Sequence, residues 1–311
     1  MFEQLGHDRL DFRIEEAQSG MKVIDVMVKW MDLSVRQVRN GKNRKDVLLN
    51  GRPVSVNGFV RTGDLITYLM EVEENYFEPE AIPIAVVFEN EDLVLINKQP
   101  FVVVHPTRSY PSGTIGNGLA MHFKKNGINP KIRFINRLDR DTSGLLLIAK
   151  NPYAQHVVTE QMKRDEVEKR YLALVHGRVE AEEGTIEAPI GRPDEDQVER
   201  SVMADGQPST THFWVRERFE NATLVEVRLE TGRTHQIRVH FSHLGHPLVG
   251  DTLYHEGSDL VGRQALHAFK LCFRLPRTGE YRSFEAPLPE DFERLLTQLR
   301  DSDTVSDAFK I

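Results

Sequence analysis

Strand-like segments outnumber helix-like ones in this chain, and this imbalance constrains its fold more than any other feature. Beyond residue 84, apolar or alternating runs are divided by turn residues, as in AVVFENEDLVLINK, YLALVHGRV, STTHFWVRERF and ATLVEVRLETG. Helical spacing occurs over 114–127, 151–170 and 233–247. Strands joined by short turns pair antiparallel. We therefore predict an α+β fold with a mixed, largely antiparallel sheet flanked by helices.

A smaller unit precedes this region. Residues 20–38 have helical spacing, and residues 46–70 form short runs cut by two Asn-Gly pairs, which are typical of hairpins. This pattern predicts a small module of helix followed by β-hairpins. The predicted division is a small module at 1–76 with its core at about 20–70, a linker at 77–83, a large domain at 84–300 and a polar tail at 301–311. We expect the tail to be disordered.

The charge of the chain is unevenly distributed. Its formal net charge is −7, but between Lys29 and Arg61 eight basic residues face only two acidic ones. Phosphate binding depends on local basic surface, so the total charge does not exclude a nucleic-acid partner. Candidates for phosphate contacts lie on the predicted helix and in the loop after it: Arg36, Arg39, Lys42 and Arg44.

Several classes of protein are disfavoured by what the sequence contains. Cys272 is the single cysteine, which excludes intramolecular disulfides and multi-cysteine zinc sites. Neither a Gly-x-x-x-x-Gly-Lys-Ser/Thr motif nor a Gly-x-Gly-x-x-Gly motif after a strand occurs, so we expect no nucleotide cofactor. The first residues are polar and acidic, and no apolar run reaches bilayer length. We expect a cytoplasmic monomer without membrane contact.

Four histidines between residues 235 and 246 raise the alternative of a zinc hydrolase. On a helix His240 and His243 share a face, but the segment HQIRVHFSH contains no acidic residue to complete a zinc site. Hydrogen-bonded or phosphate-facing histidines are the favoured interpretation. We therefore assign no metal ligand.

The segment FINRLDRDTSGLLLIAKN, residues 134–151, holds the main candidate for chemistry. Asp139 lies at a turn before a continuous apolar run, which predicts a buried strand. A carboxylate at such a turn can act as a nucleophile or general base. Alternatively, Asp139 or Asp141 hydrogen-bonds backbone amides of the turn, as Thr142 and Ser143 can. The spacing alone does not decide between these readings.

Arg233 raises a similar choice. It directly precedes Thr234, the predicted cap of the helix in RTHQIRVHFSHLGHP, and a helix entrance favours anions. A structural salt bridge is the alternative, and it stays open at this point.

Four segments together resemble, in order and spacing, the RluA-type pseudouridine synthases of the ribosomal large-subunit subgroup. They are NRLDRDTSGLLLIAK, KRYLALVHG, TGRTHQIRVHFSHLGHPLVGD and LHAFKL. NKQPFVVVHP is similar to the upstream Lys-x-x-Pro…His-Pro segment of that family. The resemblance runs from about Ile84 to Leu288. The first module is similar to the RNA-binding domain first seen in ribosomal small-subunit protein four, through LSVRQV, VLLNGRPVSVNG and GDLI.

This resemblance implies an RNA isomerase that needs no cofactor. It implies that Asp139 is the essential aspartate and that Arg233 is the basic partner of its carboxylate. Tyr171 would stack on the flipped uracil and is a candidate for helping remove its C5 proton, while Arg137 would enter the RNA stack where the base leaves. The other RNA-binding candidates in the motif around Arg233 are His235 and Arg238.

One position departs from the family's pattern. The motif usually begins with His, and here that position is Asn136. We interpret this as subgroup variation. A non-catalytic RNA-binding or ribosome-assembly factor on the same scaffold is the alternative. Structured ribosomal RNA is favoured as the substrate, and tRNA is also possible.

Overall fold

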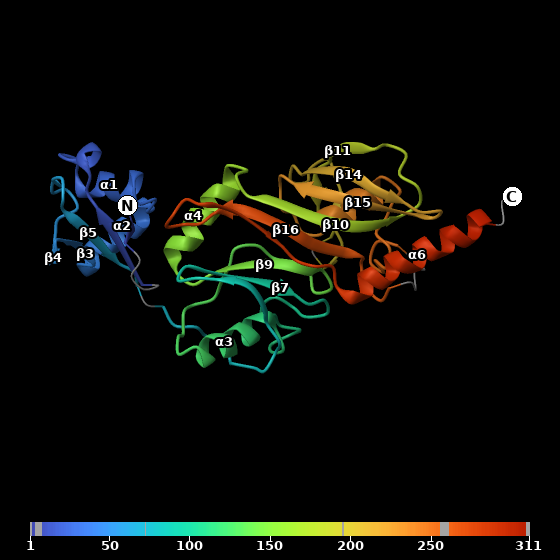
Figure 1. The fold of residues 1–311 in the computed structure, drawn as a ribbon, viewed down its shortest axis with the longest axis horizontal. Coiled ribbons are helices and arrows are strands. Elements are labelled where there is room, and N and C mark those ends of the chain that lie inside the picture. The colour runs from blue at the N-terminus through green and yellow to red at the C-terminus, as the bar shows by residue number, and fades with distance from the viewer. Residues whose placement is uncertain (1, 4–7, 72, 195, 256–260, 309–311) are drawn as a thin grey trace.

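The computed structural model describes residues 2–3, 8–71, 73–194, 196–255 and 261–308. Two sheets dominate it: a five-stranded sheet near the N-terminus and a ten-stranded sheet that crosses the rest of the molecule. In Figure 1 the smaller sheet lies to the left, in blue, and the larger one occupies the centre and right. Among the described residues, none of the helices combines the length and apolar character needed to cross a bilayer.

The N-terminal module is built from short elements in the strand order β1-β2-β5-β3-β4. Its strands are β1 (Phe2–Glu3), β2 (Arg9–Arg13), β3 (Val47–Leu49), β4 (Arg52–Pro53) and β5 (Leu65–Leu69). Its helices are a 3-10 turn (Glu16–Gln18), α1 (Val23–Lys29) and α2 (Val35–Arg44). The predicted β-hairpin module is present.

Two details of the module differ from the sequence prediction. The single helix expected over residues 20–38 is two helices, because Asp32 has a left-handed backbone (φ 52°) and Ser34 caps α2 through the N–H of Gln37. The strand β2, outside the expected core of 20–70, pairs with β5 along its whole length. Three consecutive residues of β2 are buried, so the alternation of exposed and buried positions that predicts a strand is missing there.

The large sheet has the order β11-β14-β15-β10-β16-β9-β7-β6, with β17 beside β16 and β8 beside β9. Its strands are β6 (Ala85–Glu89), β7 (Leu93–Lys98), β8 (Arg133–Phe134), β9 (Ser143–Ala149), β10 (Glu168–His176), β11 (Glu183–Glu187), β14 (Thr210–Arg218), β15 (Ala222–Leu229), β16 (Leu266–Arg274) and β17 (Tyr281–Glu285). A separate pair is β12 (Ile190–Gly191) with β13 (Ser201–Val202). Within the described ranges, β9 with β16 is the parallel pair and the remaining pairs are antiparallel. The predicted mixed, largely antiparallel α+β fold is confirmed.

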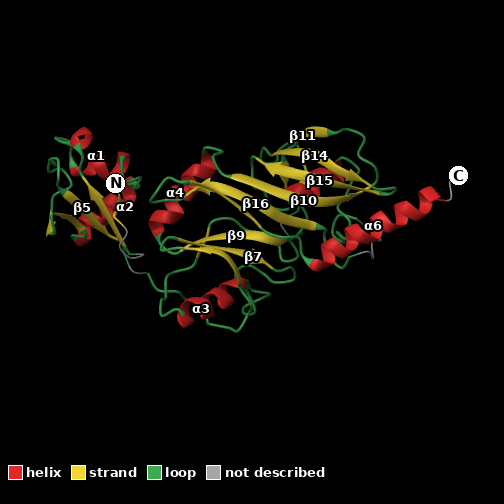
Figure 2. Cartoon of the chain, in the orientation of Figure 1, coloured by secondary structure: helices red, strands yellow, loops and turns green. Residues whose placement is uncertain are grey.

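Helices cover this sheet at several points (Figure 2). They are α3 (Ile115–Lys125), α4 (Pro152–Lys163), α5 (Gln236–His243) and α6 (Glu290–Ala308). The tail expected to be disordered from residue 301 instead continues α6 as far as Ala308. Its polar composition misled the prediction, because the helix is anchored upstream, where Phe292, Leu295 and Leu296 are buried.

The strand β9 is buried along its entire length, which explains the continuous apolar run. Leu146 and Ile148 face the core beneath α3, whereas Leu145 and Leu147 face the core that contains residues of α4. Alternate side chains of a strand point to opposite faces, so a strand covered on both sides must be apolar throughout. This central strand positions the turn that precedes it.

The core of the N-terminal module extends onto α4. Tyr153 and Val157 of α4 belong to the same buried cluster as Met27 and Tyr68 of the module. Arg277 donates to the backbone carbonyl of Arg9 (2.9 Å) and so ties the module to the large domain. The module therefore rests on α4.

Gly144 permits the contact between β9 and β16. Its φ is +111°, and a Cβ atom at this position would lie 2.3 Å from the carbonyl oxygen of Ala268. The parallel register pairs Ala268 with Gly144 and His267 with Ser143. The three atoms that a Cβ would meet are the backbone O, N and C of Ala268, so no side-chain movement can relieve the overlap. The glycine of the Thr-Ser-Gly sequence is therefore required by close approach.

Replacing Gly144 by alanine should lower the free energy of unfolding by more than about 3 kcal/mol, from left-handed strain and overpacking together. The control is Gly63→Ala, also at positive φ (+90°) but with no atom within 4 Å of the new Cβ. That change should cost about 1 kcal/mol. Urea unfolding measures both, and equal losses for the two variants would contradict the close-approach explanation.

Candidate active site

The turn between β8 and β9 carries Asp139 and is held by a buried lysine. Lys98, at the end of β7, is fully buried. Its Nζ donates to three backbone carbonyls, those of Gln99 (2.8 Å), Arg140 (2.8 Å) and Thr142 (2.9 Å). Burial lowers the pKa of Lys98 to about 7, whereas three acceptors favour the ammonium form with its three N–H bonds. The backbone directly after Asp139 is therefore fixed.

Asn136 bonds the backbone of β9. Its Nδ2 donates to the carbonyl of Leu145 (3.1 Å), and its Oδ1 accepts from the N–H of Leu147 (2.7 Å). The strand β8 pairs with β9 through Arg133 and Phe134, and the N–H of Ile135 then donates to the carbonyl of Leu147 (2.9 Å). The Asn136 side chain continues this pairing toward the turn. A primary amide offers a donor and an acceptor together, as this position requires. The departure from the family's histidine thus has a structural explanation.

The basic partner of Asp139 is Arg238, which corrects the assignment of that role to Arg233. Asp139 Oδ2 lies 3.2 Å from Arg238 Nη1. Asp251 accepts two hydrogen bonds from the same guanidinium, at 2.6 and 2.7 Å, and the ring centroid of Tyr254 lies 5.0 Å from its central carbon. The reason is the start of α5 at Gln236: Arg238 lies on the helix and is buried, whereas Arg233 precedes it and is exposed.

His235 places a second polar group near Asp139. Its backbone is left-handed (φ 57°) directly before α5. His235 Nδ1 lies 2.9 Å from Tyr254 Oη, which accepts from the N–H of Arg200 (2.9 Å). The hydroxyl proton is thus available to Nδ1, which leaves the ring proton on Nε2, 3.9 Å from Asp139 Oδ2. Burial lowers the pKa of His235, so the ring is neutral at neutral pH.

Arg137 and Arg233 lie at the exposed edge of this cluster. Arg137 Nη2 donates to Thr234 Oγ1 (2.7 Å), and Arg233 Nε donates to the carbonyl of Pro208 (3.2 Å). The prediction that Thr234 caps the helix is wrong, because His235 occupies the cap position without a side-chain cap bond. A guanidinium carries five N–H bonds, so both arginines can bind an anion as well.

Tyr171 lies on β10 opposite Val227 of β15 and is buried. It lines a cavity of about 60 Å³ together with Asp139. The other lining residues are Arg137, Leu138, Thr142, Leu229, Arg233, His235, Gln236, Ile237, Arg238 and Leu266. Burial, with a smaller contribution from the charge of Asp139, raises the pKa of the Tyr171 phenol, which therefore stays protonated at neutral pH. The predicted Asp139, Tyr171, Arg137, Arg233, His235 and Arg238 are all gathered around this one cavity.

The histidines that suggested zinc have other partners. His240 is buried, with Nδ1 2.8 Å from Thr211 Oγ1 and Nε2 2.9 Å from the carbonyl of Ala188. His246 Nδ1 lies 2.9 Å from the carbonyl of His176. In the part of the chain that the structure describes, no cluster of three or more His, Cys, Asp or Glu side chains has metal-site geometry. These contacts favour a structural role for the histidines.

Comparison with known proteins agrees with this site. A family model described as RNA pseudouridylate synthase matches residues 92–243. The chain is 44% identical over 253 residues to "Uncharacterized RNA pseudouridine synthase YjbO" of Bacillus subtilis, which covers 81% of this chain and 89% of that one. The chain belongs to the RNA pseudouridine synthase family. The resemblance to RluA-type synthases is thereby confirmed, and the protein is an isomerase that converts uridine in RNA to pseudouridine.

Two further relatives extend the comparison of this pseudouridine synthase. It is 39% identical over 279 residues to "Ribosomal large subunit pseudouridine synthase D" of Vibrio parahaemolyticus, over 82% of this chain and 85% of the relative. Among solved structures, "Human RNA Pseudouridylate Synthase Domain Containing 1" is similar with a TM-score of 0.56 and 29% identity, over 72% of this chain and 98% of that one. Family membership and the structural explanation of Asn136 weigh against the non-catalytic alternative.

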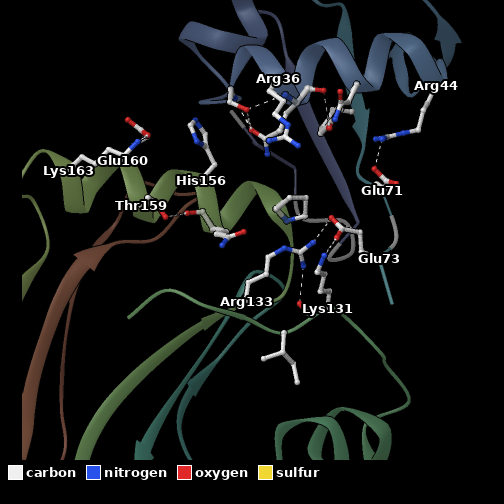
Figure 3. Close-up of a pocket in the computed structure, with 17 residues that line it drawn as sticks. Arg36, Arg44, Glu71, Glu73, Lys131, Arg133, His156, Thr159, Glu160 and Lys163 are labelled. Carbon is white, nitrogen blue, oxygen red and sulfur yellow. Dashed lines mark hydrogen bonds and ion pairs between the residues drawn. The ribbon is translucent and has the colours of Figure 1, made fainter. Parts of the chain in front are cut away.

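A larger cavity of the synthase, about 900 Å³, lies away from these residues, between the N-terminal module and α4 (Figure 3). Arg36 of α2 reaches into it from one side, and His156 and Thr159 of α4 lie on the other. Arg44 is paired with Asp46 and Glu71. No ion pair is seen for Arg36, and the exposed Arg39 and Lys42 likewise have none among the described side chains. Of the predicted phosphate-binding residues, Arg44 is thus the one already neutralised.

The sequence prediction missed three residues of the site. Lys98 lies in the family segment NKQPFVVVHP and Asp251 ends the segment TGRTHQIRVHFSHLGHPLVGD, but the sequence assigns a role to neither residue. Tyr254 lies just beyond the second segment. The sequence signal that could have indicated them is their position: Lys98 lies at the end of a strand, and Asp251 follows shortly after a helix rich in basic residues. Only the fold places them against Asp139 and Arg238.

Replacing Asn136 by alanine should lower the free energy of unfolding of the synthase by about 1–3 kcal/mol, because Leu145 C=O and Leu147 N–H lose their partner. It should also slow pseudouridine formation by loosening the turn of Asp139. Asn136→Asp keeps the acceptor and loses the donor, and we expect an intermediate loss. Urea unfolding and initial rates on RNA measure these effects, with the exposed Asn57→Ala as control. Wild-type stability in Asn136→Ala would refute the bridging role.

Proposed function

We propose that this synthase modifies specific uridines in large-subunit ribosomal RNA, with Asp139 as the essential carboxylate and with the target base flipped into the site. Relatives named ribosomal large subunit pseudouridine synthase D, in Vibrio parahaemolyticus and Xanthomonas campestris at 39% and 38% identity, support the choice of RNA. The observation that carries the proposal is the Asp139 carboxylate, which is 31% exposed and ion-paired with buried Arg238 at the edge of a cavity lined by Tyr171.

The reaction is a rearrangement in which no atom is gained or lost overall. The N1–C1′ bond of uridine breaks, C5 forms a bond to C1′, the C5 proton leaves, and N1 takes up a proton. An ionised carboxylate can attack the sugar or act as a base there. Because Asp251 fixes the guanidinium by two bonds, Arg238 can hold the carboxylate in one orientation.

Tyr171 and Arg137 have complementary proposed roles. The phenol of Tyr171 is neutral at neutral pH, so we assign it to packing against the uracil in preference to removal of the C5 proton. Arg137 lies exposed at the edge of the cavity, where it can occupy the space that the base leaves in the RNA. Arg233 and His235 are proposed to contact the RNA around the base.

The N-terminal module is proposed to bind phosphates of the same RNA. Its resemblance to the RNA-binding domain of ribosomal small-subunit protein four and the cations Arg36, Arg39 and Lys42 support this role. The strand β9 separates the turn of Asp139 from α4, so the module's cavity lies on the order of 20 Å from the catalytic turn at 3.3 Å per residue. An RNA that contacts both the module and the turn of Asp139 must span this distance, which favours a large structured RNA over a short stem-loop.

The variant Asp139→Asn should abolish release of tritium from RNA labelled at uridine C5, with a loss of at least about 100-fold in rate. Its RNA affinity should stay within about threefold of wild type, because phosphate contacts dominate affinity. Asp301→Asn, on the exposed part of α6, is the matched control. Release that survives in Asp139→Asn would refute the assignment of the carboxylate.

The double variant Arg36→Ala/Arg39→Ala should weaken RNA binding and reduce the slope of log affinity against log salt by about 2, one for each lost phosphate contact. The control pair Arg178→Ala/Arg294→Ala removes the same charge from two exposed positions of the large domain, one just after β10 and one on α6. In Figure 1, α6 lies at the opposite end of the molecule from the module. Affinity titrations over a range of salt concentrations measure the slopes. An unchanged slope in the first pair would place the phosphate contacts elsewhere.

A further inference from the structure

The segment after Lys98 runs along the edge of the turn that carries Asp139. The carbonyls of Gln99 and Arg140 both lie 2.8 Å from Lys98 Nζ, so the two segments are in direct proximity. Tyr110 returns to the same place, because its Oη accepts from Arg140 Nη1 (2.9 Å). Residues 99–110 therefore form a wall that begins and ends against the turn of Asp139, and the proposed roles of the site do not use it.

Phe101 in this wall has an unusual conformation for a bulky residue. Its φ is +66°, in the left-handed region that favours glycine, and the residue is 56% exposed. The backbone beyond it is held in place, because Val103 and Val104 accept from the N–H groups of Ile115 and Gly116 at the start of α3. Packing does not compensate this strain, since the ring is largely in solvent. Strained residues that persist in this way cluster at functional sites.

Arg140 places a guanidinium of fixed orientation beside the wall. Its guanidinium makes two bonds with Asp141 (2.8 and 2.9 Å) in addition to the bond with Tyr110. Tyr110 is 43% exposed. The Arg140 guanidinium directly follows Asp139, the Tyr110 phenol is bonded to it, and the exposed ring of Phe101 lies two residues after Gln99, whose carbonyl shares Lys98 Nζ with that of Arg140. Aromatic faces beside arginine are the usual platform for unpaired bases.

We propose that Phe101, Tyr110 and Arg140 form a base-binding site next to the active site, on which an unpaired base neighbouring the target uridine stacks. The ring of Phe101 is the stacking surface, and Arg140 with Tyr110 borders it. Flipping the target leaves its neighbour without a stacking partner, and an exposed ring beside the site restores one. This inference rests on the proposed function, because it assumes that the target base enters the cavity of Asp139.

The variant Phe101→Gly tests the site because it removes the ring without destabilising the folded protein, so that an effect on RNA binding can be measured separately. Glycine accepts the left-handed backbone, so this variant should unfold at the same or a higher temperature than wild type. It should nevertheless raise KM and the dissociation constant for large-subunit RNA transcripts by roughly 5–100-fold, the range expected for loss of one base stack. Phe101→Trp restores a ring and should recover most of the affinity. Tyr281→Ala, an exposed aromatic on β17, is the control.

The outcomes distinguish this inference from the proposed function. Unchanged KM and RNA affinity in Phe101→Gly overturn the base-binding site even when wild type is fully active. A loss of thermal stability in Phe101→Gly also overturns it, since the ring would then have a packing role. If wild type binds the transcripts but releases no tritium from them, the choice of RNA fails. In that case an affinity loss in Phe101→Gly still supports the stacking site, and unchanged affinity rejects it.

Discussion

The active site depends on the parallel contact between β9 and β16. This contact joins the part of the large sheet that contains β7 and β9 to the part that contains β10, β15 and β14. Asp139 belongs to the first part, whereas Tyr171 and Arg238 belong to the second. The two groups meet only because the strands approach closely at Gly144, where any side chain would overlap the backbone of Ala268. The chemistry therefore rests on a packing constraint.

Around this join, charge and backbone are arranged to hold one carboxylate. Lys98 bonds the backbone just after Asp139, and Asn136 ties the segment just before Asp139 to β9. Arg238 is fixed by Asp251 and by the ring of Tyr254 before it reaches Asp139. Because these supports are at least partly buried and are bonded, they need no reorganisation when RNA binds. The exposed groups at the edge, including Arg137 and Phe101, are left to contact the RNA.

Much of this could be predicted from the sequence, because strand and turn signals are local. The largely antiparallel fold, the hairpin module and the gathering of Asp139 with Tyr171 followed from patterns and from the family resemblance. The errors lie where one residue decides a boundary. Thr234 looks like a helix cap, but His235 takes the cap position. Arg233 precedes the helix in either case, and the fold instead brings Arg238, on the buried face of α5, to Asp139. The polar tail was misjudged because anchored helices extend past their apolar residues.

The sequence by itself determined the class of fold, the family and the segments that hold the site, since these depend on residue types at short spacing. Only the tertiary structure decided which arginine pairs with Asp139, why Asn136 is suitable in place of histidine, and why Phe101 lies strained beside the turn. The physical reason is that ion pairs and backbone bonds join residues far apart in the chain. Asp139 and Arg238 are separated by 99 positions, and no local pattern encodes their 3.2 Å contact.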